Sequence, residues 1–275
     1  MIANVLTIAG TDPSGGAGIQ ADIKTFSALG AYATSAITAV VAQNTMGVRS
    51  YLALEPSFVA DQMDAVFDDV RIDAVKIGMV ANAGIAEVIV DRLVHHKARN
   101  IVLDPVMVAK SGHHLLDPDA IAAVREVLVP VANLITPNLP EAGVLLDTKP
   151  NWTLTEMRRR VHELRELGSE WVLLKGGHLE GSSESTDLLH GSSGTIEFSS
   201  PRIQTRNDHG TGCTLSAAIT ALLPAHGIEE SVRAAKTYLQ GALSASGTLS
   251  VGHGHGPLHH FHALWSTPQE PGDQS

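Results

Sequence analysis

The fold of this chain is decided by the stretch Asn4-Val5-Leu6-Thr7-Ile8-Ala9 and by the glycine-rich loop after it, Gly10-Thr11-Asp12-Pro13-Ser14-Gly15-Gly16-Ala17-Gly18. The first run is apolar enough for a buried strand. Beyond the loop, apolar side chains recur at about one-turn spacing and stop before Gly30, which predicts an amphipathic helix; they are Ile19, Ile23, Phe26 and Leu29. A strand, a glycine loop and a helix in this order form a βα unit.

The same alternation continues along the chain. Further strand candidates are Thr34 to Ala42, Ala74 to Ile77, Ile101 to Leu103, Leu134 to Thr136 and Trp171 to Leu174. Several are apolar throughout, as expected for parallel strands with helices on both faces. A further helical pattern begins at Met157 and stops before Gly168. The sequence therefore predicts an α/β fold with a largely parallel sheet covered by helices.

Two features modify this pattern. Residues Leu188 to Arg202 contain two short β-like runs separated by Gly191-Ser192-Ser193-Gly194, which predicts a hairpin at an antiparallel edge of the sheet. Neither a repeat nor a Ser/Pro-rich linker divides the 275 residues, so we expect one domain over residues 1–265. Residues 266–275 lose their apolar side chains and are expected to form a flexible tail.

Composition excludes several classes of protein. With 44% apolar and 17% charged residues the chain can build a sizeable core, which argues against disorder. The formal charge of -10 argues against a general nucleic-acid binder. Neither a secretory signal nor a run of about 18 apolar residues is present, so no membrane association is expected. The single cysteine fits a reducing cytoplasm.

The first glycine loop is a candidate ligand site because it follows the carboxyl end of a strand, where open α/β sheets bind ligands. Its spacing matches neither GxGxxG nor the P-loop, since Ala17 and Gly18 stand where a P-loop needs Lys and Ser/Thr. A tight turn that needs glycine is the alternative interpretation. Asp22, one turn later, could face a ligand or simply lie on the helix surface.

A second glycine segment is the stronger candidate: Asn207-Asp208-His209-Gly210-Thr211-Gly212-Cys213-Thr214, followed by an apolar helical run from Leu215 to Leu223. Free backbone N–H groups and the positive end of the helix dipole at such a start favour anions, including a phosphoryl group in transfer. The same field would lower the pKa of Cys213 from about 8.5 towards neutrality. The alternative is that Cys213 is a small buried apolar residue.

Three charged residues follow other strands. Asp104 and Glu141 offer the few oxygen ligands that Mg²⁺ uses together with phosphates and water. Lys175 ends the strand Trp171 to Leu174 and could place its ammonium on a nucleotide phosphate. The alternatives are a turn anchor for Asp104, a helix-start residue for Glu141 and an ordinary exposed lysine.

Other catalytic or metal patterns are weak. The histidines near the end of the chain are not accompanied by cysteine and are interrupted by Gly and Pro, so we interpret them as solvated or structural; they are His253, His255, His259, His260 and His262. No GxSxG motif indicates a serine hydrolase.

Taken in order, seven motifs resemble the hydroxymethylpyrimidine/phosphomethylpyrimidine kinase family of thiamine biosynthesis, over about residues 4–265. They are Ala9-Gly10-Thr11-Asp12-Pro13-Ser14-Gly15-Gly16-Ala17-Gly18-Ile19-Gln20-Ala21-Asp22, Ala42-Gln43-Asn44-Thr45, Lys76-Ile77-Gly78-Met79, Asp104-Pro105-Val106-Met107, Thr136-Pro137-Asn138-Leu139-Pro140-Glu141-Ala142, Lys175-Gly176-Gly177-His178 and His209-Gly210-Thr211-Gly212-Cys213-Thr214. The resemblance implies a three-layer α/β/α ribokinase-like fold. It also implies a homodimer that uses ATP and Mg²⁺ to phosphorylate 4-amino-5-hydroxymethyl-2-methylpyrimidine twice.

The resemblance also implies roles for individual residues. Gln43 would hydrogen-bond the pyrimidine, surrounded by Gly10, Ala17, Asp22, Met79 and Val106. Gly210, Thr211 and Gly212 would form the anion hole, with Cys213 as proton acceptor and Lys175 as a phosphate contact. Asn138 and Glu141 would position Mg²⁺, helped by Asp104.

We also expect the segment Val108 to Leu115 to close over the phosphates as a lid and to bring Lys110 to the monophosphate in the second step. The same segment could instead be an exposed connector.

One departure from the wider superfamily concerns Cys213, since many sugar kinases carry Asp at this position. Two other functions remain open on the sequence. Pyridoxal kinase is the nearest, because related folds accept another flat heteroaromatic alcohol. A pyrimidine-binding regulatory module without catalysis is the second; the combination of Glu141, Lys175 and the glycine segment at 210–213 argues against it.

Overall fold

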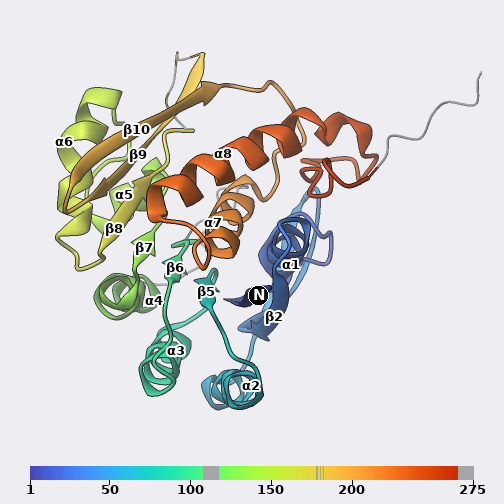
Figure 1. Ribbon diagram of the computed structural model, residues 1–275, viewed down its shortest axis with the longest axis vertical. Helices are drawn as coiled ribbons and strands as arrows, with labels where there is room; N and C mark the ends of the chain where they lie inside the picture. The colour runs from blue at the N-terminus through green and yellow to red at the C-terminus, as the bar shows by residue number, and fades with distance from the viewer. Residues whose placement is uncertain (108–117, 178, 180, 182, 266–275) are drawn as a thin grey trace, which may run out of the picture.

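The computed structural model describes residues 1–107, 118–177, 179, 181 and 183–265. Within them the chain forms an eight-stranded sheet in the order β10-β9-β8-β7-β6-β5-β1-β2 (Figure 1). In this sheet the six strands β8, β7, β6, β5, β1 and β2 are parallel to their neighbours in that order, whereas β9 is antiparallel to both β8 and β10. The strands are β1 Asn4–Ala9, β2 Tyr32–Ile37, β5 Ala74–Ile77, β6 Ile101–Leu103, β7 Leu134–Ile135, β8 Trp171–Leu174, β9 Glu184–Gly191 and β10 Gly194–Pro201.

Helices cover both faces of this sheet, and the three-layer α/β/α architecture is confirmed (Figure 1). One face carries α1 Gly18–Ala28, α7 Thr211–Leu222 and α8 Ile228–Ser244, followed by the short turn η3 Ser246–Thr248. The other carries α2 Pro56–Asp69, α3 Ala83–His95, α4 Pro118–Ala123, η1 Val124–Leu128, η2 Val129–Val131, α5 Leu139–Leu145 and α6 Leu154–Arg165.

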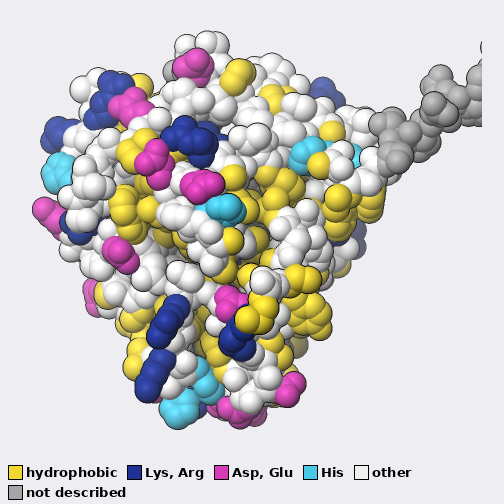
Figure 2. Space-filling view, viewed as in Figure 1, with side chains coloured by type: hydrophobic (Ala, Val, Ile, Leu, Met, Phe, Trp, Pro, Cys, Tyr) yellow, Lys and Arg dark blue, Asp and Glu magenta, His cyan; other side chains and the backbone are white. Residues whose placement is uncertain are grey.

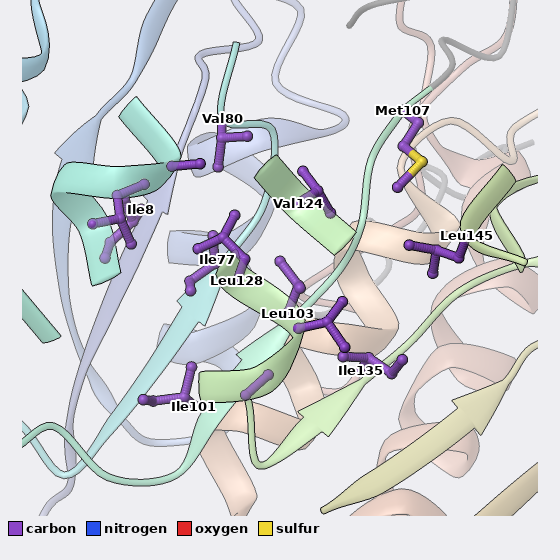
Figure 3. Packing of buried hydrophobic residues seen from close by; sticks show 14 of the residues in the cluster. Ile8, Ile77, Val80, Ile101, Leu103, Met107, Val124, Leu128, Ile135 and Leu145 are labelled. Atoms are coloured by element: carbon purple, nitrogen blue, oxygen red, sulfur yellow. The ribbon is translucent and has the colours of Figure 1, made fainter. Parts of the chain in front are cut away.

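The core explains why the parallel strands are apolar throughout. Figure 3 shows Ile77, Leu103 and Ile135 from neighbouring strands on the sheet face that also packs Val124 and Leu128 of η1. The adjacent residues of these strands, such as Val102 and Leu134, point to the opposite face and pack under α7 and α8. Because both faces are buried, each such side chain contributes about 1.5–3 kcal/mol.

The strand predicted from Thr34 to Ala42 is wrong as a single element. β2 ends at Ile37, and the chain then forms β3 Ala39–Asn44, which pairs with β4 Gly47–Ala53 in a separate two-stranded antiparallel sheet. Thr38 lies at the division: its backbone N–H donates to Ala9 O (3.0 Å) and its hydroxyl donates to Met79 O (2.6 Å). These bonds hold the chain at the end of β1, so that β3 leaves the main sheet and pairs with β4.

The hairpin predicted between Leu188 and Arg202 is confirmed by β9 and β10, with Gly191 paired to Gly194. Among the described residues, no helix is long and apolar enough to cross a membrane. On the face drawn in Figure 2, acidic and basic side chains are interspersed, and Lys and Arg do not gather into a single patch there.

Candidate active site

A cavity of about 990 Å³ opens at the carboxyl ends of the parallel strands, where the topology places loops from several βα units. Thirteen of the fifteen residues predicted for the site line it: Gly10, Ala17, Gln43, Met79, Val106, Asp104, Asn138, Glu141, Lys175, Gly210, Thr211, Gly212 and Cys213. The cavity also extends past Lys175 to side chains of β9, β10 and α8, among them Asp187, Ser200 and Leu239.

The first glycine loop is both a tight turn and a wall of the cavity. Gly18 opens α1 with φ of 56°, and a Cβ there would lie 2.5 Å from Gly10 O. Only glycine accommodates this conformation at so close an approach. The turn places Gly10 and Ala17 on the cavity side, so the two interpretations of this loop are compatible.

The second glycine segment starts α7. Gly210 is the residue before the helix, with φ of 81° and no side-chain cap. Helix geometry leaves the N–H groups of Gly212 and Cys213 without acceptors in the helix. These donors lie at the positive end of a 12-residue helix dipole and line the cavity. The segment is therefore built to bind an anion.

A lysine lies beside these donors. A Cβ placed on Gly212 would be 3.1 Å from Lys175 Nζ, so the ammonium is directly beneath the helix start. Lys175 Nζ donates to Asp104 Oδ1 at 2.9 Å and lies 4.0 Å from Glu141 Oε2. The prediction of an ordinary exposed lysine is excluded, because only 11% of the side chain is exposed.

The carboxyl groups on either side of Lys175 differ in their electrostatics. Burial opposes ionisation of Asp104, but the ammonium groups of Lys175 and Lys76 hold the pKa of Asp104 below its usual range. Burial raises the pKa of Glu141 to about 7, because the attraction of Lys175 does not offset it. Glu141 also forms a capping box with Asn138 at the start of α5, with bonds of 2.8 and 2.9 Å.

The predicted low pKa of Cys213 is wrong for this cavity. Burial raises the pKa of the Cys213 thiol to about 12, because Lys76 does not offset the lost hydration and the nearby carboxylates of Asp104 and Asp22. The prediction considered only the helix dipole and local amides, which the sequence shows. The acidic neighbours come from distant strands and helices, so the thiol is neutral at pH 7.

Asp22 is also placed differently from its prediction. Its side chain is fully buried rather than solvated and does not appear in the cavity lining, so it cannot contact a ligand directly here. The carboxylate accepts hydrogen bonds from Thr7 Oγ1 (2.6 Å) and from Lys76 Nζ (2.9 Å). Burial opposes the charge of Lys76, but Asp22 holds the pKa of Lys76 above its usual range.

Sequence reasoning missed two residues that join the glycine segments. The Asp12 carboxylate is 1% exposed and lies 2.7 Å from His209 Nε2. Both residues line the cavity and both stand inside the quoted motifs. The signal was present, since each lies next to a glycine segment, but nothing in the sequence pairs residues 197 positions apart.

Two other predictions have separate outcomes. Lys110 and the proposed lid from Val108 to Leu115 fall in residues 108–117, outside the described part of the chain. The structural interpretation of the late histidines is confirmed for His259 and His260, which are buried. In the described ranges, no group of three or more His, Cys, Asp or Glu side chains is arranged to hold a metal ion.

Comparison with known proteins decides the family. The family described as phosphomethylpyrimidine kinase matches residues 12–259. The chain belongs to this family. The hydroxymethylpyrimidine/phosphomethylpyrimidine kinase of Salmonella typhimurium is 58% identical over 263 residues, which cover 95% of this chain and 98% of that protein. The resemblance of the sequence motifs to the phosphomethylpyrimidine kinase family is therefore confirmed, and with it the assignment as a phosphotransferase.

Solved structures agree with the family. The crystal structure of phosphomethylpyrimidine kinase from Clostridium difficile has a TM-score of 0.78 and 42% identity, covering 88% of this chain and 99% of that one. An ADP complex of Bacillus subtilis pyridoxal kinase has a TM-score of 0.87 and 32% identity, covering 96% and 99%. The ribokinase-like fold expected for a phosphomethylpyrimidine kinase is confirmed.

Proposed function

We propose that this chain transfers the terminal phosphoryl group of ATP to the hydroxymethyl group of 4-amino-5-hydroxymethyl-2-methylpyrimidine, and then phosphorylates the monophosphate to the diphosphate. The observation that carries this proposal is the start of α7 at Gly210–Cys213, which lies in the cavity with Lys175 beneath it. Anion-binding amides and a buried ammonium together suit a phosphoryl group in transfer.

The pyrimidine occupies the part of the cavity formed by Gly10, Ala17, Gln43, Met79 and Val106. Gln43 is half-buried in β3 at a bulge after Ala42, which turns its amide relative to the regular strand. A side-chain amide both donates and accepts, as the amino group and ring nitrogens of the pyrimidine require. The sulfur and methyl groups of Met79 and Val106 supply apolar contact for the ring. Asp22 supports this region only indirectly, through Lys76.

The phosphates of ATP occupy the centre of the cavity. Backbone N–H groups of the segment Gly210 to Cys213, chiefly those of Gly212 and Cys213, receive the transferred group, and Lys175 neutralises its oxygens. The charge of Lys175 is balanced by Asp104. Phosphoryl transfer has a loose transition state, so positioning and neutralisation supply most of the catalysis.

Mg²⁺ fits the residues around Lys175. This ion prefers one or two carboxylates, phosphate oxygens and several waters, and does not need a complete protein cage. Asp104 and Glu141 offer cavity-lining carboxylates, and Asn138 fixes Glu141 through the capping box. When bound, Mg²⁺ would supply charge neutralisation at the phosphates. Ionisation of Glu141, whose pKa is about 7, would accompany its loading.

Cys213 is the proposed acceptor of the substrate hydroxyl proton. The thiol must first release its own proton to water, and burial opposes this. We therefore place the proton transfer late, when the hydroxyl oxygen already bonds phosphorus and its proton has become acidic. A variant Cys213→Ala that keeps near-native turnover would reject this role, since a general base contributes about 10²- to 10⁴-fold.

The decisive experiment is a time course with hydroxymethylpyrimidine and MgATP that resolves the monophosphate and the diphosphate. We expect the monophosphate to appear first and the diphosphate to follow at its expense. Tight binding of the pyrimidine without any turnover would instead support a regulatory module. Lys110→Ala tests the second step separately: an unchanged rate for both transfers removes the role assigned to Lys110.

Pyridoxal phosphorylation is a second candidate, favoured by the TM-score of 0.87 with the Bacillus subtilis pyridoxal kinase. Both alcohols should be offered together at equal concentration. The proposal predicts a higher kcat/KM for the hydroxymethylpyrimidine. A higher kcat/KM for pyridoxal would replace it.

We further propose that residues 1–265 act as one cytoplasmic catalytic domain that assembles as a homodimer, with a small molecule rather than nucleic acid or membrane as its partner. Val40 and Leu52 pair across β3 and β4 and are 50% and 68% exposed, which supports an interface on this sheet. Light scattering should give a molar mass in solution of twice the chain mass. In Leu52→Asp this molar mass should fall towards that of the monomer.

A further inference from the structure

The buried carboxylate of Asp12 accepts several hydrogen bonds within the first glycine loop. Its Oδ1 accepts hydrogen bonds from the backbone N–H (2.8 Å) and the hydroxyl (2.6 Å) of Ser14. Its Oδ2 accepts from the backbone N–H groups of Gly16 (3.1 Å) and Ala17 (2.7 Å). The carboxylate therefore holds the loop that presents Ala17 to the pyrimidine side of the cavity.

The same carboxylate reaches the phosphate side of the cavity. His209 Nε2 lies 2.7 Å from Asp12 Oδ2, and His209 directly precedes Gly210, the residue before the anion-binding helix start. A carboxylate only accepts hydrogen bonds, so His209 must carry its proton on Nε2 and donate. One buried carboxylate thus contacts both Ala17, on the proposed pyrimidine side, and the segment proposed to bind phosphate.

The two loops also touch without free space between them. A Cβ on Gly210 would lie 1.8 Å from Gly16 O, and a Cβ on Gly16 would lie 2.5 Å from Cδ2 of His209. Closely packed groups transmit a displacement instead of absorbing it. A shift of either loop must therefore move the other or break the bond between Asp12 and His209.

Electrostatics keep this connection intact. Burial disfavours a charge on Asp12, but the hydrogen bonds from His209 and Ser14 outweigh it and hold its pKa far below the usual range. The carboxylate stays ionised throughout the pH range in which a cytoplasmic enzyme works. Hydrogen bonds to an ionised group are about twice as strong as neutral ones.

We propose that Asp12 and His209 are positioning residues that couple the two halves of the cavity, so that bound pyrimidine tightens the binding of MgATP and bound MgATP tightens that of the pyrimidine. The inference rests on the proposed function, since it needs both ligands. Pyrimidine contact with Ala17 fixes the first loop through Asp12, and the bond to His209 then fixes Gly210 and the N–H groups after it. Such coupling is reciprocal and typically changes an affinity about 5- to 150-fold.

The test is a binding titration with AMP-PCP and Mg²⁺, an unreactive pair, with and without saturating hydroxymethylpyrimidine. The unmodified protein should bind the analogue at least about 5-fold more tightly when the pyrimidine is present. In His209→Ala this factor should fall to near one. His209→Gln should keep most of it, because the glutamine amide can donate to Asp12 from nearly the same place.

A matched control is His226→Ala, which removes a histidine paired with Glu230 at 3.2 Å on the surface. This variant should keep the full coupling factor. Urea unfolding of each variant verifies that it is folded, and His209→Gln provides the test if His209→Ala does not fold, because loss of coupling in His209→Gln would count against a role for the donated bond.

The outcomes separate this inference from the proposed function. Turnover of the pyrimidine without measurable coupling in the unmodified protein, or undiminished coupling in His209→Ala, overturns the inference alone. Failure of the unmodified protein to bind or phosphorylate the pyrimidine overturns the proposed function and this inference with it. Loss of coupling in His209→Ala with retention in His209→Gln and His226→Ala supports it.

Discussion

The ammonium of Lys175 lies 2.9 Å from Asp104 Oδ1, immediately beneath the backbone of Gly212. The pair is almost completely buried. Lys175 directly follows β8 and Asp104 directly follows β6, and β7 lies between these two strands. A cation held in this way is already dehydrated and oriented before a phosphate arrives. We therefore expect Lys175 to assist phosphoryl transfer with little rearrangement.

Replacement of Lys175 tests this preorganisation. Lys175→Met should lower kcat/KM for MgATP by about 10²- to 10³-fold, because a fixed positive charge at the transferred oxygens is lost. Steady-state kinetics with the pyrimidine at saturation measure the change. The control is Lys149→Met, at an exposed lysine, which should leave the rate unchanged. A Lys175→Met effect below about threefold would contradict the assignment.

The reactivity of Cys213 should be low. With a thiol pKa of about 12, its alkylation by iodoacetamide at pH 8 should be about 10³-fold slower than that of an unperturbed cysteine with pKa near 8.5. Since Cys213 is the chain's only cysteine, mass spectrometry reads the rate directly. Unfolding in guanidinium should restore the ordinary rate. A folded-state rate that levels off below pH 8 would show a reactive thiolate instead.

The pair between Lys76 and Asp22 should control stability. Lys76→Met leaves the Asp22 carboxylate buried without its cation and should lower the free energy of unfolding by about 3–5 kcal/mol in urea titrations. The double variant with Asp22→Asn should recover much of this loss. Arg158→Ala, which breaks an exposed pair with Glu197 at 2.6 Å, should cost less than about 1 kcal/mol. Equal losses of unfolding free energy in Lys76→Met and Arg158→Ala would show that the buried pair contributes no more to stability than the exposed pair.

Glu141 should make stability depend on pH. Its pKa is about 7 in the folded chain against 4.5 for the free side chain, so the folded state binds the proton more tightly. Stability from this group is fully present below pH 4.5 and is lost as pH rises to 7. Glu141→Gln removes this dependence. The free energy of unfolding of the variant should therefore rise relative to that of the unmodified protein between pH 5 and 8, by about 3 kcal/mol at most.

A matched control for Glu141 is Glu156→Gln, since Glu156 occupies the same position of a capping box in α6 but is only half-buried there. Hydrogen bonds from Thr153 lower the pKa of Glu156, so its pH dependence should have the opposite sign. Urea titrations at pH 5 to 8 measure both variants. A gain for Glu141→Gln that is largest at low pH would contradict the burial of Glu141.

Much of the fold could be predicted because its signals are local. The bounds of β1, β5, β6 and β8 agree with the predicted runs, and the hairpin around Gly191 is present. The single strand predicted from Thr34 to Ala42 was wrong because this apolar run contributes β2 to the main sheet and β3 to the two-stranded sheet. The division at Thr38 depends on Met79, 41 residues away, which no local pattern contains.

The sequence by itself determined the βα pattern, the two glycine segments and the residue types that surround the cavity, because periodicity and backbone requirements act within a few residues. Only the tertiary structure decided which charges are buried together. It brought Asp104 to Lys175 across 71 residues and Asp12 to His209 across 197. The neutral state of the Cys213 thiol has the same tertiary origin, because its pKa depends on lost hydration and on the charges of Lys76, Asp104 and Asp22 around it.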